Sequence, residues 1–347
     1  MKIPKEKAKL RLAPLFLLPL LAFLAPVLSQ AQTHVKLATL LPRGSSHYQI
    51  LLGMGQEWRK NSGGSITLTI YPDGNKGGEE DTVRLMRVGD IQAATLSVSG
   101  LSEIDPSVGA LQKIPMIYHS LDELEYVRSK MEPDLERRLE QKGFVVLFWA
   151  DAGWVRLFSR EAALRPDDFK KMKVFVGASD QEEIGLVKGL GFQAVPLAWT
   201  EVLTSLQTKL VDSVPTAPFL ALAGQYDLVA HHMLELNWVP LVGATVMTKK
   251  AWEKIPADQR DQFLKTSANA GKQMQARSRV ESDEAVTAMK KRGLQAHAVS
   301  PQLENEWRQF SEAIYPKIRG TMVPAEMFDE VRRLVSEYRA GGGAKKP

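Results

Sequence analysis

Short apolar runs rich in β-branched residues alternate along the chain with longer segments in which apolar residues recur every three or four positions. The first pattern predicts strands and the second predicts helices. The expected strands are 35–39, 66–71, 92–96, 144–149, 173–176, 193–197, 212–214 and 243–248, and the clearest helices are 47–60, 121–142 and 200–210. This alternation predicts an α/β fold with mainly parallel sheets.

One passage from helix to strand occurs twice. An amphipathic segment ends at Gly89 before Asp90 opens a strand, and a second ends near Lys209 before Asp212 does the same. The repeat predicts two similar halves, although the general pattern of α/β chains produces short matches of this kind as well.

Residues 257–293 contain no proline and carry apolar residues that fit one helical face in parts. At ~1.5 Å per residue, a helix of this length reaches about 50 Å. A helix of that length is longer than one small domain. We therefore expect a single long helix that connects two domains.

The N-terminus predicts export. Residues 1–11 are rich in lysine and arginine, an apolar run covers 12–28, and the small residues Ser29 and Ala31 supply a cleavage site before Gln32. This order is typical of a signal peptide, here residues 1–31, and predicts a periplasmic protein. The alternative is a membrane anchor, but a run of about 17 residues is at the lower limit for a span. Three prolines interrupt it.

Composition excludes several classes of protein. The 347 residues include no cysteine, so disulfides, zinc–thiolate sites and thiol nucleophiles are excluded. The net charge is +5, and most of it lies in the first eleven residues, which hold five cations and one anion. The remainder is close to neutral, so we expect no nucleic-acid partner. The length favours two domains.

Three motifs that suggest chemistry have structural interpretations. The glycine-rich loop at 74–78 continues into three acidic residues instead of the lysine that a phosphate-binding loop requires, so we expect these acids at a helix N-terminus. Ser179 lacks the second glycine of a nucleophile elbow and is expected to cap a helix. Adjacent His231 and His232 point to different sides of a regular element, so the two imidazoles cannot easily bind one metal ion together. We expect no catalytic residue, no metal site and no cofactor, and hence no enzyme.

Six aromatic residues lie at expected strand ends and loops. They are Tyr48, Trp154, Phe175, Trp199, Phe219 and Trp238. Some are expected to be ordinary core. Gathered at the carboxyl ends of parallel strands, however, they would line the crevice where α/β sheets bind small ligands.

Six segments, in order, resemble the solute receptors of tripartite ATP-independent periplasmic (TRAP) transporters, of the DctP type. These segments are 63–74, 87–94, 112–118, 165–176, 190–214 and 249–256. The resemblance implies a periplasmic binding protein fold of two hinge-connected lobes and a long spanning helix, which closes over a small ligand. It also implies delivery of the ligand to small and large membrane permease subunits. We expect lobe I at 32–154 plus about 243–285, lobe II at 155–242 plus about 286–338, and a disordered tail at 339–347.

The chain departs from the family where the ligand is expected. Receptors of this family usually hold an organic acid through an arginine, and Phe175 stands at that position. A second family arginine matches Arg156 if one residue of slack is allowed. The segment 211–215 also lacks the polar group that the family carries after its turn. A buried carboxylate without a cation costs several kcal/mol, and the guanidinium fork normally offsets that cost.

We therefore expect a small apolar or aromatic-bearing solute, packed by Trp154, Phe175, Trp199 and Phe219, with at most one acidic end paired to Arg156. Burial of each large aromatic contact contributes ~1.5–3 kcal/mol, so several could replace an ion pair. One alternative keeps an organic acid and assigns the clamp to Arg156 or Lys173. A second alternative is an envelope interaction protein that does not take part in transport.

Overall fold

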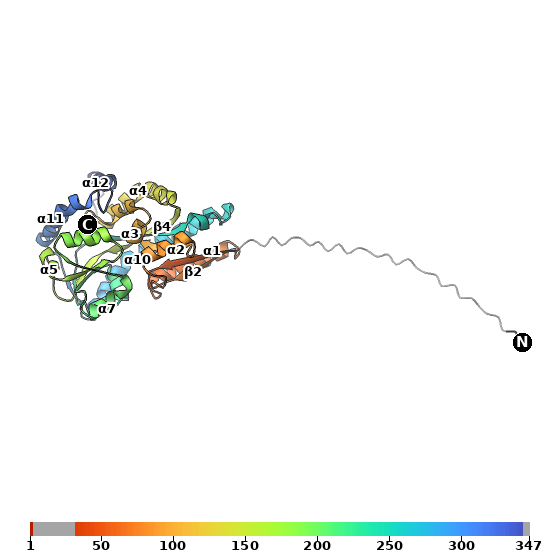
Figure 1. The fold of residues 1–347 in the computed structure, drawn as a ribbon, viewed down its shortest axis with the longest axis horizontal. Coiled ribbons are helices and arrows are strands. Elements are labelled where there is room, and N and C mark those ends of the chain that lie inside the picture. The colour runs from red at the N-terminus through yellow and green to blue at the C-terminus, as the bar shows by residue number, and fades with distance from the viewer. Residues whose placement is uncertain (3–31, 343–347) are drawn as a thin grey trace. The chain divides into compact units, whose positions relative to one another are not determined.

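The computed structural model describes residues 1–2 and 32–342 (Figure 1). The predicted signal peptide lies almost entirely outside the described residues, and so does the end of the predicted tail. In the part of the chain that is described, no helix is both long and apolar enough to cross a membrane.

The first lobe is built on a five-stranded sheet with the order β2-β1-β3-β10-β4. Its strands are β1 (Thr33–Thr39), β2 (Ile66–Tyr71), β3 (Ala93–Ser97), β4 (Phe144–Trp154) and β10 (Pro240–Thr248). Helices α1 (Ser46–Asn61), α2 (Glu79–Val88), α3 (Val98–Ser102), η1 (Pro106–Leu111) and α4 (Leu121–Gln141) belong to the same segment of chain. Strand β1 is buried at Val35 and Leu37, which lie on the same face because alternate residues in a strand share a face.

The second lobe is built on a six-stranded sheet with the order β11-β9-β5-β8-β6-β7. Its strands are β5 (Arg156–Ser159), β6 (Lys173–Gly177), β7 (Gln193–Leu197), β8 (Ser213–Thr216), β9 (His232–Leu234) and β11 (Gln295–His297). The helices of this segment are α5 (Pro166–Lys170), α6 (Gln181–Gly189), η2 (Trp199–Glu201), α7 (Val202–Gln207), α8 (Pro218–Ala223) and η3 (Tyr226–Leu228). The two sheets confirm the predicted two-lobe α/β fold.

The two sheets repeat one arrangement. Strand β1 pairs in parallel with β2 and β3, and β6 pairs in parallel with β7 and β8. An antiparallel strand then follows on the same side, β10 beside β3 and β5 beside β8. The helix-to-strand passage that occurs twice in the sequence corresponds to the junctions α2–β3 and α7–β8. At these junctions Gly89 and Lys209 both have a left-handed backbone, with φ of 85° and 60°. The expected similarity of the halves is confirmed.

Parallel pairing is less dominant than the sequence pattern predicts. Among the described strands, five pairings are parallel and four are antiparallel. The antiparallel pairings all involve β5 or β10, which lie where the chain passes between the sheets. A strand that arrives from the other lobe is not bound by the helical crossover that makes neighbouring strands parallel.

The predicted long helix is present as α10 (Ala257–Lys291), together with the short preceding helix α9 (Lys249–Trp252). Phe263, Ala270 and Met274 of α10 share a hydrophobic cluster with Phe148 of β4 in the first lobe. Further along α10, Ala285 and Met289 share a cluster with the core of the second lobe. The helix therefore packs on both lobes, as expected for a connecting strut.

The last two helices differ from the expected lobe assignment. Residues 286–338 were expected in the second lobe, and Trp307 of α11 (Pro301–Ile318) does pack there. Helix α12 (Ala325–Ala340) instead packs on α4 and η1 of the first lobe, where Figure 1 shows α12 beside α4. Arg339, expected in the disordered tail, lies in α12 and pairs with Glu123 at 2.8 Å. The exact lobe boundaries stay a prediction.

Candidate functional site

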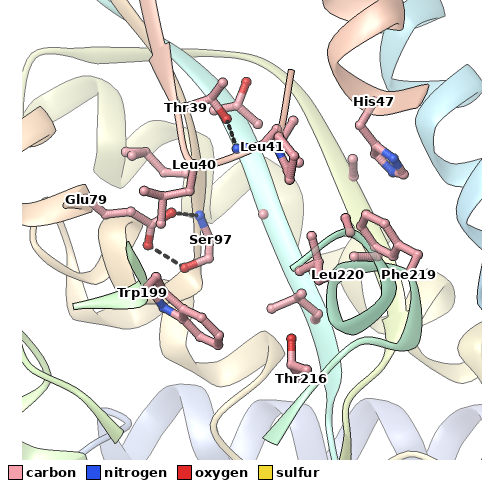
Figure 2. Close-up of a pocket in the computed structure, with 18 of the residues that line it drawn as sticks. Thr39, Leu40, Leu41, His47, Glu79, Ser97, Trp199, Thr216, Phe219 and Leu220 are labelled. Carbon is pink, nitrogen blue, oxygen red and sulfur yellow. Dashed lines mark hydrogen bonds between the residues drawn. The ribbon is translucent and has the colours of Figure 1, made fainter. Parts of the chain in front are cut away.

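A cavity of about 440 Å³ lies between elements of the two lobes (Figure 2). From the first lobe, Thr39 at the end of β1 and Ser97 at the end of β3 line it. From the second lobe, Trp199 follows β7 and Thr216 ends β8. The cavity thus lies outside the carboxyl ends of parallel strands from both sheets, which is where α/β proteins bind ligands. We call it the main cavity.

Most of the surface of the main cavity is apolar. Leucine, phenylalanine and alanine side chains predominate, among them Leu40, Leu41, Leu96, Phe148, Leu203, Phe219, Leu220 and Leu241. Figure 2 shows Leu40 and Leu41 facing Phe219 and Leu220 from the opposite lobe. A ligand placed here is in contact mainly with hydrocarbon from both lobes.

Among the residues that the structure describes, no lysine or arginine lines the main cavity, whereas His47, Asp73, Glu79 and Asp151 do. Asp151 is buried and forms a two-pronged ion pair with Arg279 of α10, with N–O distances of 2.6 and 3.1 Å. Asp73 accepts a hydrogen bond from the backbone of Arg43 at 3.0 Å. An anionic ligand would therefore meet no lysine or arginine in the described lining, which leaves a buried negative charge without a guanidinium or ammonium partner.

Glu79 links the start of α2 to the turn after β3. Its carboxylate accepts hydrogen bonds from Ser97 N at 2.6 Å, from Ser97 Oγ at 2.5 Å and from Gly100 N at 3.0 Å, and Figure 2 marks the two from Ser97. Burial raises the pKa of Glu79, while the bonds from Ser97 and Gly100 oppose that rise. The expected acidic start of the helix is confirmed, since Glu79, Glu80 and Asp81 occupy its first turn.

Two uncharged polar side chains can bind a ligand directly. Thr216 is 1% exposed, and its Oγ1 has no hydrogen-bond partner among the described residues. Figure 2 shows this hydroxyl directed into the cavity. The Oε1 of Gln112 accepts from Val242 N at 2.8 Å, which fixes the side chain and leaves its amide N–H groups to donate. An unpaired buried hydroxyl is costly, so Thr216 is a strong candidate for a ligand contact.

His47 at the start of α1 brings α1, α10 and α8 together. Its Nε2 lies 2.9 Å from Ser278 Oγ, its Nδ1 lies 3.5 Å from Glu281, and its ring stacks on Phe219 at 4.8 Å. Burial lowers the pKa of His47, and Glu281 opposes this. The serine, histidine and carboxylate resemble a catalytic triad in order, but Ser278 is fully buried, is absent from the cavity lining and donates to Met274 O. The cluster holds Phe219 in place.

A second cavity of about 160 Å³ adjoins the first, and Ser99 and Gln112 line both. Most of its wall is apolar, with residues from β6, α6 and α11. The rings of Phe175 and Trp199 meet edge to face at 4.6 Å, Phe175 lining the second cavity and Trp199 the main cavity. These two aromatic side chains form part of the partition between the cavities.

The aromatic residues singled out from the sequence are only partly brought together. Trp199 and Phe219 line the main cavity, and Phe175 and Trp238 line the second. Tyr48 and Trp154 line neither of these two cavities. Tyr48 is buried in the first turn of α1, and Trp154 packs against the core of the first lobe.

Arg156 also lines neither cavity. Its guanidinium donates to the backbone carbonyl of Glu235. Burial lowers the pKa of Arg156, and the nearby carboxylates of Glu235 and Asp283 raise it. Lys173, the other candidate clamp, donates to the carbonyl of Lys209. In this arrangement neither cation reaches a ligand in the main cavity.

The prediction that Ser179 caps a helix is wrong by one residue. Helix α6 begins at Gln181, and its N-cap is Asp180, whose carboxylate accepts from Glu183 N at 2.9 Å. The carboxylate of Asp180 also pairs with Lys113 at 2.5 Å. The histidines likewise bind locally, since His231 lies 3.1 Å from Asp227 O and His232 lies 3.0 Å from His297.

The sequence interpretation missed Thr216, Gln112 and the role of Glu79 in the site. Gln112 begins one of the segments that carries the resemblance, and Thr216 follows the altered segment after the family's turn. Attention to uncharged polar residues in those segments would have found both. Nothing local to Glu79 signals its contact with Ser97, which comes from a strand 18 positions further along the chain.

The family model of bacterial extracellular solute-binding protein, family 7 (DctP), matches residues 37–320. Protein YiiZ of Salmonella typhimurium is 26% identical over 260 residues, covering 74% of this chain and 77% of that protein. The C4-dicarboxylate-binding periplasmic protein DctP of Rhodobacter capsulatus is 22% identical over 280 residues, covering 80% and 84%.

Solved structures share the fold at lower identity. The sugar acid binding protein DctPAm of Advenella mimigardefordensis, in complex with galactonate, has a TM-score of 0.82 at 18% identity, covering 88% of this chain and 98% of that one. Since the family model spans most of the sequence, the chain belongs to family 7 of the bacterial extracellular solute-binding proteins, the solute receptors of TRAP transporters.

Proposed function

We propose that this receptor binds a small, uncharged and largely apolar solute in the main cavity. The observation that carries the proposal is the lining, which is mostly apolar and, in the part of the chain that the structure describes, includes three carboxylates but no lysine or arginine. The volume of about 440 Å³ falls in the usual range of small-molecule sites, roughly 300–1,000 Å³. The contacts expected for such a solute are apolar packing on Trp199 and Phe219, with a hydrogen bond from Thr216.

The solute is held by closure of the two lobes. Support comes from the lining, because Thr39 and Leu96 belong to the first lobe and Trp199 and Phe219 to the second. Helix α10 packs on both lobes and β4 leads into β5 through Val155 alone, so these segments form the hinge. Phe175 and Trp238 line the second cavity and bound the site from that side.

Residues 1–31 direct export to the periplasm, and the receptor delivers its solute to the small and large permease subunits of the membrane. The proposal rests on the lysine-rich and apolar order of the N-terminus and on the family. Genes for two permease subunits beside this one are the expected arrangement. Their absence would favour the envelope interaction protein.

A second candidate ligand is an organic acid. It is favoured by the relatives, one named as a C4-dicarboxylate-binding protein and another solved with galactonate. In this candidate Arg156 leaves the carbonyl of Glu235 and turns toward the ligand. Such a movement exchanges a buried hydrogen bond for an ion pair.

The two candidates are separated by a thermal-shift panel that sets neutral apolar probes, such as short alkanols and cyclohexanol, against succinate and galactonate. We expect the neutral probes to raise Tm and the acids to leave it unchanged. Thr216→Val, which removes the hydroxyl at constant shape, is expected to weaken hydroxylated probes about 5- to 10-fold, as for loss of a hydrogen bond of ~1–1.5 kcal/mol.

Arg156→Ala serves as the discriminating variant. If the ligand is neutral, the affinity of Arg156→Ala for the neutral probes should stay within about twofold of the wild-type affinity, after correction for any change in stability. Stabilisation by acids that disappears in Arg156→Ala would establish the second candidate instead.

A further inference from the structure

The second cavity adjoins the main cavity. It shares Ser99 and Gln112 with the main cavity, so the two cavities lie on either side of the same side chains. The remainder of the partition includes the edge-to-face pair of Phe175 and Trp199. Aromatic rings at such a position can turn aside for a narrow apolar chain without exposing polar groups.

The second cavity is suited to hydrocarbon. Its apolar wall includes Leu186, Val187, Leu190, Phe192, Trp238 and Trp307. Leu186 and Val187 lie in α6, Trp307 lies in α11 and Trp238 precedes β10, so separate elements of the fold form this wall. Protein interiors are normally packed without such voids, because unfilled apolar space is destabilising.

The lysine that lines the second cavity is already paired. Lys113 and Glu183 line it. The ammonium of Lys113 pairs with Asp180 at 2.5 Å, and the side chains of this pair are only 8% and 5% exposed. A ligand carboxylate would have to displace Asp180, which would then be left buried without its cation. Among the described residues the second cavity therefore offers an acidic head no free cation, whereas the unpaired hydroxyl of Thr216 lies in the main cavity.

We propose that the solute is amphipathic, with an unbranched hydrocarbon chain whose end occupies the second cavity and an uncharged polar head that stays in the main cavity near Thr216. This inference rests on the proposed function and adds the shape of the solute. The chain passes Gln112 and the pair of Phe175 and Trp199. Phe175, at the position where relatives are expected to carry an arginine, is thus part of an apolar passage between the cavities.

Chain length is the test. Binding of 1-alkanols from butanol to decanol is followed by tryptophan fluorescence, since Trp199 lines the main cavity and Trp238 and Trp307 line the second. Each added methylene that becomes buried should tighten Kd about fourfold. We expect this gain to continue beyond the chain length at which the main cavity alone is filled.

Val187→Phe and Leu186→Phe fill the second cavity from α6, where both residues are half-buried and a larger ring can be accommodated. In each variant we expect the short alkanols to bind within twofold of the wild type and the longest to lose at least tenfold. Leu228→Phe, at a position 48% exposed and outside both cavities, is the matched control and should leave the whole series unchanged.

A series that levels off at the same chain length in the wild type and in Val187→Phe would overturn the inference and leave the neutral-solute proposal standing. If no alkanol binds while succinate or galactonate does, the proposed function itself fails, and the inference fails with it. In Trp238→Phe, the fluorescence change specific to long chains should shrink. An unchanged signal would also contradict entry into the second cavity.

Discussion

Lys113 and Asp180 form a buried ion pair between the lobes, and Glu183 lies one turn further along α6. Burial, together with the charge of Asp180, raises the pKa of Glu183 to about 7 against the opposing charge of Lys113. The three residues hold one cation against two carboxyl groups, so one carboxyl group takes up a proton near neutral pH. This part of the lobe contact is therefore sensitive to pH.

Glu183 predicts a specific pH dependence of stability. Its pKa in the folded protein, about 7, lies above the ordinary 4.5, so the folded protein binds more protons between these values. Stability from this group is complete below pH 4.5 and is lost as pH rises through about 7, with a slope of at most ~1.4 kcal/mol per pH unit. In urea unfolding, Glu183→Gln should flatten this slope.

Glu182→Gln is the control, since Glu182 is exposed at the neighbouring position. It should keep the wild-type slope. An unchanged slope in Glu183→Gln would show that this carboxyl group does not carry the pH dependence.

Which individual side chains line the site was harder to predict from the sequence than the fold. Arg156 was assigned to the ligand by allowing one residue of slack, but in a strand a shift of one residue turns the side chain to the opposite face. Arg156 occupies the first position of β5 and donates to Glu235 instead. The aromatic residues were expected at strand ends, and this was sufficient for Trp199 and Phe219. It was insufficient for Tyr48, whose helix turns it into the core.

At the scale of elements, α10 depends on one close approach. A Cβ at Gly271 would lie 2.8 Å from Phe148 Cδ2 and 2.9 Å from Phe148 Cβ, so the helix contacts β4 directly through its backbone. The second atom cannot swing away, because it is attached to the backbone of the strand. The position of the strut against the first lobe therefore requires glycine.

Alanine substitutions at two helical glycines test this contact. Gly271→Ala gains ~1 kcal/mol of helix propensity but incurs overpacking of ~1–3 kcal/mol, so we expect a net loss of up to ~2 kcal/mol in unfolding free energy. Gly185→Ala in α6, where no atom lies within 4 Å of the added Cβ, should gain ~0.5–1 kcal/mol. Equal effects of the two substitutions in chemical denaturation would refute the close approach.

The bounds of elements with strong local patterns were predicted closely. The elements against which they pack were not. Helix α10 was expected within 257–293 and spans Ala257–Lys291, because the segment lacks proline and keeps an apolar face in parts. Helix α12 was expected in the second lobe and packs on α4 instead. An amphipathic pattern determines which face of a helix is buried. It does not determine which of two lobes covers that face.

At the scale of the whole molecule, the fold was predictable because alternation and six ordered segments are distributed over the chain. The site was not, because the main cavity is lined by residues from both lobes and from α10, including Met274. Family relationship at 22% identity carries the architecture and the receptor role. The ligand depends on a few side chains, and Phe175 is one at which the sequence predicts a departure from the family pattern.

The charge class of the natural ligand tests the account most directly. The receptor should be purified under mild conditions from its own host and analysed by native mass spectrometry, with the released ligand identified afterwards. We predict an uncharged molecule with a hydrocarbon chain, at one copy per protein. Recovery of a small dicarboxylate or sugar acid as the sole bound species would contradict the account.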